Sequence, residues 1–453
     1  MEQNLIKKVE SFLITHATIN GFDLLLSDSN GVIRGKRVSK DNLIKSFVEG
    51  VLMPGSIFAL DITGKDIEET DLQWGQGDPD QLCFPEINTL KPCPWYQKPR
   101  GQVLLTMYDK RQNPFFADPR QVLKKVLQLY QSKNLTPVIA VELEFYLVNQ
   151  NCTNEGQSFF TPLTSKYDTS AQVYSLARLD DYKSFFDDIE HYSTIQDIPA
   201  ESAVSEASPG QFEINLRHVD NAIIAADHGV LLKRLVKGVA RKHGFEATFM
   251  AKPFAHLAGN GMHIHFSLQD KEGKNIFNND QEEGSHFLQN SIGGLLELMS
   301  ESMAILAPNA NSYRRFQNHS YAPTKPTWGY NNRTTAIRIP GGNNEAKRIE
   351  YRVAGADANI YLVIAIILAA AYHGIENKIN PSKPIQGNSY NNHYQSLPNT
   401  WQEALSYFEQ SKILATYLGS DFCKFYSTCR HIERNRFRSL VSNHEHNWYL
   451  HTL

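Results

Sequence analysis

The chain has 453 residues, of which 41% are hydrophobic and 21% are charged, the balance of a folded globular protein rather than a disordered one. This length allows two or three ordinary domains, or one large domain with a smaller one attached. The net charge of −3 gives no electrostatic reason to expect a nucleic acid or an anionic membrane as a partner.

The N-terminal part of the chain combines short strand-like runs with turns. Residues 1–14 read as an amphipathic helix rather than a signal peptide, because charged residues interrupt the apolar ones. The segment FDLLLSDSNGVIRGKRV predicts a hairpin that turns at Ser29-Asn30-Gly31. Asp118-Pro119-Arg120 then begins a helix, with Asp at the N-cap and Pro at the first helical position. We therefore predict a small α+β domain over residues 1–112 and a larger domain over residues 113–453.

Four segments of the larger domain alternate strictly between polar and apolar residues, which is the period of a β-strand. Their polar faces carry, in chain order, Glu142 and Glu144; Glu213, Asn215 and Arg217; His263, His265 and Ser267; and Arg348, Glu350 and Arg352. One such strand is usually part of an antiparallel sheet with one face in water. Four polar faces made mainly of Glu, His and Arg instead indicate a site for metal ions and phosphate.

The carboxylates of this set suit a pair of divalent cations. Glu142 and Glu144 lie two residues apart, roughly 6.5–7 Å along a strand, so each can bind one of two neighbouring ions. Oxygen ligands with a single imidazole favour Mg²⁺ or Mn²⁺ over zinc. Carboxylates that converge without a metal repel one another, and a divalent ion both relieves the repulsion and supplies the Lewis acid for phosphoryl transfer.

Arginines follow the carboxylates along the chain. Arg333, Arg338, Arg348 and Arg352 fall within twenty residues, and Arg315 comes before them. Guanidinium groups bind carboxylate and phosphate oxygens through two parallel hydrogen bonds. A network of surface charges is the alternative interpretation, but strand alternation places Arg348 and Arg352 beside Glu350. Because the sequence has no Walker-type phosphate loop, these arginines indicate phosphoryl transfer and an acidic substrate.

Two further features concern the compartment. The five cysteines are scattered and form no C-x-x-C pair, which argues against a disulfide framework or a thiolate zinc site and fits a reducing cytosol. The longest apolar run, Ile360 to Ala371, is shorter than the roughly 20 residues that cross a bilayer. We therefore predict a cytoplasmic protein in which this run forms a buried helix.

From about Phe58 onwards the chain resembles the glutamine synthetase superfamily. The segments that carry the resemblance, in the family's order and spacing, are VELEF, SEASPGQFEINL, GNGMHIHFSL, NSYRRF, NNRTTAIRIP and RIEYR. One E-x-E is a weak signal, whereas six ordered motifs are a strong one. The resemblance implies an α+β fold with an N-terminal β-grasp domain and a catalytic domain whose curved antiparallel sheet forms the site. It also implies a homo-oligomer of stacked rings, a dodecamer, in which each site is completed by the neighbour's N-terminal domain.

The resemblance also assigns roles position by position. It implies two or three Mg²⁺ or Mn²⁺ ions per site, the first held by Glu144, Glu206 and Glu213 and the second by Glu142, His263 and Glu350. Glutamate is assigned to Gly259 and Arg315, with Arg352 serving substrate and phosphoryl oxygens, and the transferred phosphoryl group to Arg333, Arg338 and His265. ATP is assigned to Glu201, Ser267 and Arg348.

Two departures from the family pattern point to a particular branch. Glutamine synthetases that use ammonia carry a glutamate in a flap, whereas here the corresponding stretch is NHSYAP, with Tyr321 at that position. The family's ammonium-binding segment is replaced by FALDITGKD, which leaves only Asp61 as a counterpart. Together with FFADPR and APTKPTWGYNNRT, these changes resemble the γ-glutamylputrescine (γ-glutamylpolyamine) synthetases. Loss of a carboxylate makes room for an alkyl amine, whose entrance Tyr321 and Trp328 are predicted to line; the alternative is that Tyr321 only packs.

The implied reaction couples ATP to amide formation. The γ-carboxylate of glutamate attacks the terminal phosphate of ATP, and an amine then displaces phosphate from the γ-glutamyl phosphate. Asp61, from the adjacent subunit, is the candidate for binding the ammonium group and accepting its proton. One alternative is an ordinary glutamine synthetase that uses ammonia. The other is a catalytically silent structural or regulatory relative, against which the retention of all six metal ligands argues.

Overall fold

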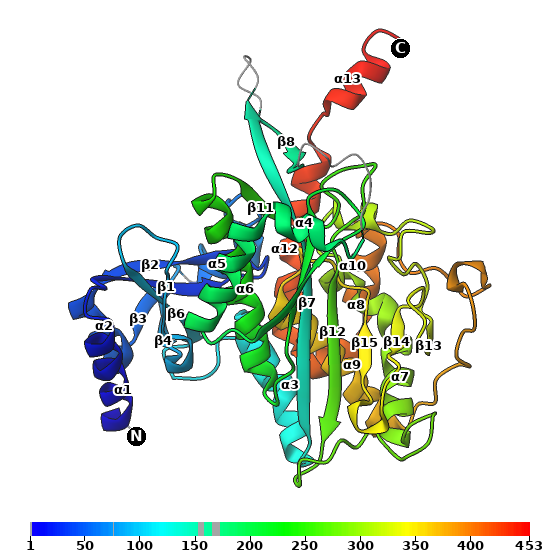
Figure 1. Cartoon of the computed structure of the whole chain (residues 1–453), viewed down its shortest axis with the longest axis horizontal. Helices are drawn as coiled ribbons and strands as arrows, with labels where there is room; N and C mark the ends of the chain where they lie inside the picture. The colour runs from blue at the N-terminus through cyan, green and yellow to red at the C-terminus, as the bar shows by residue number, and fades with distance from the viewer. Residues whose placement is uncertain (1, 76, 153–157, 165–172) are drawn as a thin grey trace.

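The structure is a computed structural model of the chain, and it describes all residues except 1, 76, 153–157 and 165–172. Figure 1 shows an N-terminal part beside a larger part that is built on a second sheet. The chain passes from the first sheet to the second through helix α3 (Pro119–Ser132). The side chain of Asp118 accepts a hydrogen bond from the backbone N–H of Arg120, so the predicted N-cap is confirmed.

The N-terminal part contains one mixed sheet. Its strands are β1 (Gly21–Ser27), β2 (Ile33–Ser39), β3 (Val51–Pro54), β4 (Asp80–Pro85), β5 (Lys91–Pro92) and β6 (Arg100–Tyr108), and its helices are α1 (Glu2–Thr15) and α2 (Lys40–Glu49). The strand order is β2-β1-β6-β4-β3, with β5 pairing with β6 and β1 running parallel to β6. The predicted hairpin is confirmed: β1 and β2 pair in antiparallel register, and Gly31 in their turn has φ 75°.

The larger part is built on a curled, predominantly antiparallel sheet. Its strands are β7 (Thr136–Cys152), β8 (Ser158–Pro162), β9 (Ala200–Ser205), β10 (Gln211–Leu216), β11 (Glu246–Thr248), β12 (Met262–Gln269), β13 (Trp328–Tyr330), β14 (Ile337–Ile339) and β15 (Ile349–Tyr351). The order is β13-β14-β15-β12-β7-β10-β9, with β8 and β11 pairing with β7. The four strands predicted from alternation are therefore β7, β10, β12 and β15, and they are direct neighbours.

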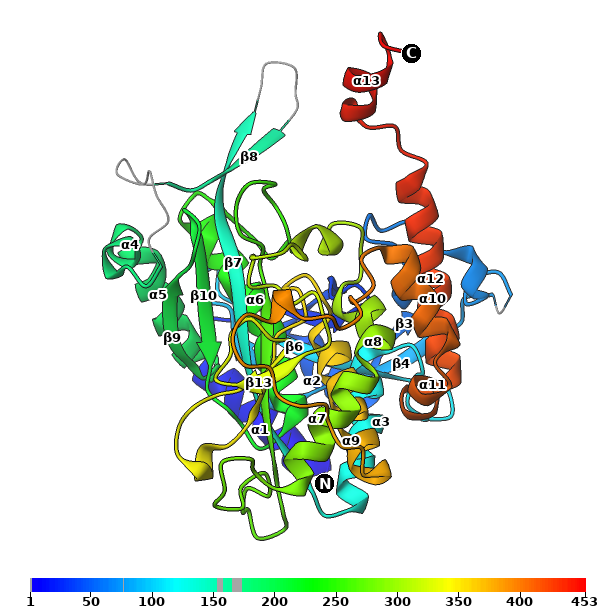
Figure 2. The same ribbon diagram turned by 90° about the vertical axis from the view of Figure 1, so that its right-hand side faces the viewer.

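Helices cover one side of this sheet (Figure 2). The helices of the larger part are α4 (Leu176–Asp181), α5 (Lys183–Ile195), α6 (Ala222–Lys242), α7 (His286–Glu297), α8 (Met299–Leu306), α9 (Ile360–Asn377), α10 (Trp401–Gln410), α11 (Lys412–Leu418), α12 (Ser420–Arg438) and α13 (Asn443–Tyr449), the last of which projects away from the sheet. The apolar face of each central strand packs into the core: on β7, the side chains of Val141, Leu143 and Phe145 are fully buried. The opposite face is thereby left free for the polar side chains.

The apolar run predicted as a buried helix lies in α9. The helix continues beyond the run to Asn377, and every residue from Ile360 to Ala371 is buried. Among the described residues it is the one helix long and apolar enough to cross a membrane, but 78% of that window is buried inside the protein. Contacts with α3, α7 and α6 account for its composition, because a helix enclosed on all sides is apolar all round.

Candidate active site

Strand register brings the predicted metal ligands together. Glu142 on β7 lies opposite His263 on β12 and opposite Asn215 on β10. One pleat further along, Glu144 lies directly opposite Glu213. Side chains directly opposite on one face of an antiparallel pair have Cβ atoms about 5 Å apart. Their carboxylates and imidazole therefore converge on one patch of the sheet.

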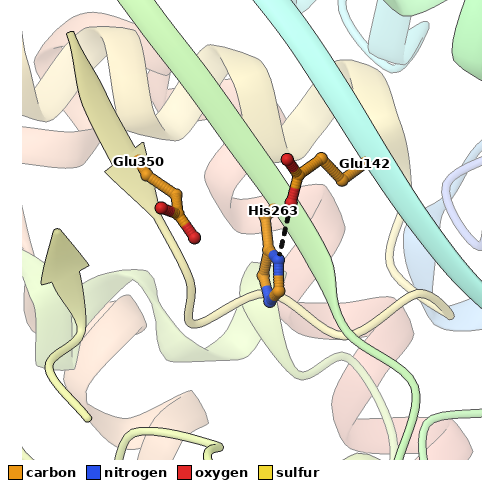
Figure 3. A group of neighbouring side chains, drawn as sticks. All are labelled: Glu142, His263 and Glu350. Carbon is orange, nitrogen blue, oxygen red and sulfur yellow. Dashed lines mark hydrogen bonds and ion pairs between the residues drawn. The ribbon is translucent and has the colours of Figure 1, made fainter. Parts of the chain in front are cut away.

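Two overlapping groups of donor atoms result. Glu142, His263 and Glu350 offer ligand atoms that all lie within 4.8 Å of one another, and so do Glu144, Glu213 and His263. Figure 3 shows the first group, with side chains that come from three different strands and point toward a common space. His263 Nδ1 lies 3.0 Å from Glu142 Oε2. The two groups share His263, so they lie side by side in one site.

The carboxylates of this patch repel one another. Burial, and then the charges of Glu142, Glu144 and Glu206, raise the pKa of Glu213 to about 10. Burial and the neighbouring Glu144 raise the pKa of Glu206, which follows β9, to about 7. These four carboxylates, together with Glu350 and the imidazole of His263, form a hard, oxygen-rich donor set. Divalent cations of the Mg²⁺ or Mn²⁺ type fit it, because they relieve the repulsion that raises these pKa values.

Two histidines of β12 contact the carboxylate of Glu142. His265 Nε2 lies 2.9 Å from Glu142 Oε1, so Glu142 contacts both histidines of β12. Glu142 is half-buried, which raises its pKa, but its interactions with His263 and His265 hold that pKa well below the ordinary value. Arg348 Nε donates to His265 Nδ1 at 3.1 Å, which fixes the orientation of that ring.

Glu350 connects the donor cluster to the predicted phosphoryl-binding arginines. It lies opposite His265 on β12 and opposite Arg338 on β14, and its carboxylate pairs with both Arg338 and Arg352. Burial alone would raise the pKa of Glu350, but Arg352 above all lowers it to about 2. Glu350 therefore stays ionised and orders two guanidinium groups beside the donor cluster.

A glycine-lined space adjoins the cluster. A Cβ atom at Gly261 would lie 2.8 Å from Arg315 Nη2 and 3.1 Å from His263 Nε2, and one at Gly259 would lie 2.8 Å from Arg315 Cγ. Arg315 is 5% exposed and donates to two backbone carbonyl groups. Among the described residues it has no carboxylate partner. A buried guanidinium group without a counter-ion, beside space that only glycine leaves open, suits the carboxylate of a small substrate.

The predicted nucleotide residues line a cavity of about 440 Å³ that reaches the cluster at Glu142. Glu201, Ser267 and Arg348 all belong to its wall. The wall also contains polar residues for which no role is predicted: Ser202, Asn215, His218, Gln269, Asn275 and Glu345. Asn215 lies on a predicted polar face, so alternation carried a signal for it. His218 lies beyond the end of β10, where alternation gives no signal.

Residues 116–449 match the glutamine synthetase catalytic-domain family. The chain belongs to the glutamine synthetase family. It is 43% identical over 446 residues to the γ-glutamylputrescine synthetase of Escherichia coli (strain K12), covering 98% of this chain and 94% of that protein. It is 32% identical to a glutamate–isopropylamine ligase of a Pseudomonas species, covering 98% of each. A solved structure of GmaS with ADP matches with a TM-score of 0.84 and 29% identity, covering 98% of this chain and 99% of that chain.

Two residues predicted from the glutamine synthetase pattern are exposed in this chain. Arg333 is exposed, and its charge acts on Glu206, whose pKa it lowers slightly against the carboxylates. Tyr321, at the flap position, is 65% exposed with φ 58°, so its phenol ring packs against little of the chain. The role of Tyr321 at the amine entrance stays a prediction.

Trp328, which the resemblance predicts at the amine entrance, is buried in this chain. The indole is 2% exposed, and its Nε1–H donates to the carbonyl oxygen of Ser382 at 2.7 Å. It lies on β13, the outermost strand of the sheet, next to Tyr330. The Ser382 loop, distant in sequence, thus contacts the indole, and the role of Trp328 at the amine entrance stays a prediction.

Asp61 is held within the N-terminal part of its own chain. Its Oδ1 accepts hydrogen bonds from Thr63 and from the backbone N–H of Lys65, and Arg436 of α12 donates to Oδ2 at 2.8 Å. Burial would raise its pKa, but the hydrogen bonds from Thr63 and Arg436 lower it to about 2. In this conformation Asp61 is suited to binding a cation and poorly suited to accepting a proton.

Proposed function

We propose that this chain is an ATP-dependent ligase that joins the γ-carboxylate of glutamate to an alkyl amine, with a polyamine such as putrescine as acceptor. The observation that carries the proposal is the pair of overlapping donor groups beside Arg315, a buried arginine that has no acidic partner in the described part of the chain. The names of two relatives support the acceptor class, since one makes γ-glutamylputrescine and the other joins glutamate to isopropylamine.

The reaction proceeds in two steps. A γ-carboxylate oxygen of glutamate attacks the terminal phosphorus of ATP, the bond from that phosphorus to the bridging oxygen of ADP breaks, and γ-glutamyl phosphate forms. The amine nitrogen then attacks the γ-carbonyl carbon, the carbon–oxygen bond to phosphate breaks, and the nitrogen loses a proton. Products are the γ-glutamyl amide, ADP and phosphate.

The carboxylates and His263 are the proposed metal ligands. The first ion is assigned to Glu144, Glu206 and Glu213, and the second to Glu142, His263 and Glu350. When bound, Mg²⁺ or Mn²⁺ neutralises the phosphate oxygens and makes the terminal phosphorus more electrophilic. We propose two or three such ions for each site.

The arginines and glycines of the chain bind and orient the substrates. Arg315 and the adjacent Gly259 receive glutamate, because the guanidinium group is buried and lacks a carboxylate partner among the described side chains. Arg338 and Arg352, ordered by Glu350, face the transferred phosphoryl group together with the exposed Arg333 and with His265. Charge that develops on that group is thereby met by donors already in place.

The amine end of the site combines the flap with a neighbouring subunit. We propose that Tyr321 lines the acceptor entrance and that Asp61 of an adjacent subunit binds the cationic amine. Alkyl amines have pKa values near about 10, as in lysine, so the nitrogen must lose a proton before it attacks. Asp61 accepts that proton only where its pairing with Arg436 is broken, since the pairing holds its pKa low.

Kinetics with a panel of acceptors test the proposal. ADP release is measured with glutamate, Mg²⁺ and either putrescine, spermidine, a simple monoamine or ammonium. We expect at least about a tenfold higher kcat/KM for the best alkyl amine than for ammonium, since each buried methylene group adds discrimination. A preference for ammonium establishes the first alternative, an ordinary glutamine synthetase. No turnover with any amine, with Mg²⁺ or Mn²⁺, establishes the second, a catalytically silent relative.

We propose further that the enzyme is a homo-oligomer of stacked rings, with twelve subunits. The C-terminal segment 440–453 projects from the body of the chain (Figures 1 and 2), and Leu440, Trp448 and Leu450 are each at least 65% exposed. A seven-residue helix such as α13 is not stable alone, so its apolar side chains need a partner. Light scattering on the full chain and on a chain ending at residue 439 tests this: an unchanged mass on truncation contradicts a role of the segment in assembly.

The proposed partners are therefore glutamate, ATP and an amine, together with further copies of the chain. We propose no nucleic-acid or membrane partner, in keeping with the net charge of −3. The proposed compartment is the cytoplasm, where ATP is available and where the buried free thiols of Cys83, Cys93, Cys423 and Cys429 remain reduced.

A further inference from the structure

A second cavity lies between the N-terminal sheet and α6, apart from the candidate active site. Its volume is about 350 Å³, and none of the residues assigned above to metal, glutamate or nucleotide lines it. Figure 1 shows α6 between the N-terminal sheet and the large sheet. One helix supplies all the basic side chains of its wall, which are Lys233, Arg234, Lys237 and Arg241.

Two of these four basic groups are already paired. Arg234 Nη2 lies 2.7 Å from Asp23 Oδ2, and Arg234 Nε donates to Gln102. Arg241 Nε lies 3.1 Å from Glu246 Oε1. Both guanidinium groups therefore contribute to the folded structure, and their charges are largely compensated by acids outside the cavity wall.

The two lysines are not compensated. Lys233 donates only to neutral acceptors, the carbonyl oxygens of Ala356 and Ala358, at 2.5 and 3.2 Å. Over the residues that the structure describes, neither Lys233 nor Lys237 has a carboxylate within ion-pair distance. They lie one helical turn apart, and both ammonium groups lie within 6 Å of the centroid of the Phe249 ring. Two like charges thus face the same space.

The described part of the wall offers these ammonium groups one acidic side chain, whose charge acts on Lys233 from beyond ion-pair distance. Asp357 is the one acidic side chain among the described residues of the wall, and its Oδ2 is engaged by Asn309 and Ser312 at 2.7 and 2.6 Å. Burial, and then the charge of Lys237, lower the pKa of Lys233 to about 7. An anion in the cavity would stabilise the charged form of Lys233, because an opposite charge nearby favours ionisation.

Two aromatic side chains of the N-terminal part, Trp95 and Tyr96, belong to the wall. Trp95 packs directly on α6 at Gly238, where a Cβ atom would lie only 2.7 Å from the indole ring. The missing side chain lets the indole close the cavity beside Lys237 and Arg241, with Tyr96 next to it. A flat apolar wall beside two unpaired cations suits an organic molecule that carries an acidic group.

We propose that this cavity binds a small oxyanion, the carboxylate or phosphate group of a metabolite, between Lys233 and Lys237. The inference does not rest on the ligase function, because it uses no residue of the candidate active site. Its occupant is a free molecule rather than an acidic side chain from another copy of the chain, and the test separates these two.

Pyridoxal 5′-phosphate is a suitable probe because it carries both an aldehyde and a phosphate. A lysine nitrogen adds to the aldehyde carbon, water leaves, and borohydride reduces the resulting imine to a stable secondary amine that mass spectrometry can locate. Pyridoxal, which lacks the phosphate, has the same aldehyde chemistry. The ratio of the two labelling rates therefore measures oxyanion binding separately from the nucleophilicity of each lysine.

At Lys237 or Lys233 we expect pyridoxal 5′-phosphate to label the full-length protein about tenfold faster than pyridoxal, as expected for a hydrogen bond to a charged group. Inorganic phosphate should slow this labelling. At Lys242, on the same helix but paired with Asp188, the ratio should stay near one. Equal ratios at all three lysines overturn the proposal, and so does an absence of labelling because another copy of the chain fills the cavity.

Variants separate the two lysines. Lys237→Gln is at an exposed position, so it leaves the fold intact and should abolish the phosphate-dependent part of labelling at Lys233. Lys233→Gln should do the same at Lys237, and thermal unfolding checks that this variant is folded. Lys242→Gln is the matched control, with no effect on labelling of the cavity. Phosphate-dependent labelling that survives both cavity substitutions contradicts the proposal.

Discussion

The glutamate side chains of the site lie close enough together to repel one another. Glu144 is central to this repulsion, because its charge is among the causes that raise the pKa values of Glu206 and Glu213. The backbone N–H of Gly261 donates to Glu144 Oε2 at 2.6 Å, which fixes the carboxylate in place. Removing the Glu144 side chain therefore deletes a proposed metal ligand and, in the metal-free protein, relieves the repulsion.

We accordingly expect Glu144→Ala to lower the rate of ADP release more than about a hundredfold. Loss of a residue that only supports a metal ligand costs up to about a hundredfold, and loss of the ligand itself should cost more. The midpoint of thermal unfolding without metal should be no lower than in the unsubstituted protein, and Mg²⁺ should raise it less. Glu190→Ala, at an exposed position on α5, is the control and should change neither quantity. Full activity of Glu144→Ala refutes the metal assignment.

A substitution at the flap position can change the preference among amine acceptors with little effect on the fold. Tyr321 is 65% exposed, so Tyr321→Glu removes little buried surface. We expect the carboxylate to lower kcat/KM for putrescine about tenfold relative to ammonium, because it restores charge and takes up space at the entrance. Tyr321→Phe should keep the amine preference. Parallel changes for both acceptors would show that the residue does not select the amine.

At the scale of elements, alternation predicted the strands β7, β10, β12 and β15 and the polar face that each of them carries. It could not predict their order or register, since the pairing of Glu144 with Glu213 joins strands far apart in the chain. The short β13 shows the same limit: the sequence presents Trp328 as a site residue, and only the distant Ser382 loop explains its burial. The charge of Asp61 is likewise set by a residue 375 positions away.

Glutamate binding is predicted to depend on Gly261, which directly precedes β12. Gly261→Ala places a methyl group 2.8 Å from Arg315 Nη2, the flexible end of a side chain, so the guanidinium group shifts and the fold tolerates the change. We expect KM for glutamate to rise at least about tenfold, as for loss of a charge-assisted hydrogen bond, with little change in thermal unfolding. Gly341→Ala, whose Cβ would meet atoms no nearer than 3.7 Å, is the control. An unchanged KM contradicts the assignment of Arg315.

For the whole molecule, the cluster couples metal binding to stability and pH. The pKa values of Glu206 and Glu213, about 7 and about 10, lie above their ordinary value of 4.5. At a pH between 4.5 and its own raised pKa, each of these glutamates is protonated in the folded chain and ionised in the unfolded chain. The free energy of unfolding therefore falls as pH rises through this range, by up to about 1.4 kcal/mol per pH unit for each proton. Glu350 and Glu142, whose pKa values are lowered, act in the opposite sense and only below about pH 4.5.

The metal-free protein should therefore unfold at a lower temperature at about pH 8.5 than at about pH 5.5. Divalent cations bind the ionised carboxylates, so stabilisation by saturating Mg²⁺ should increase over the same range, and calorimetry should detect protons released on binding. Glu213→Gln removes the most strongly shifted group and should flatten the metal-free pH dependence, whereas Glu190→Gln should not. A metal-free stability that rises from pH 5.5 to 8.5, or Mg²⁺ binding without proton release, would mean that these carboxylates do not share one site.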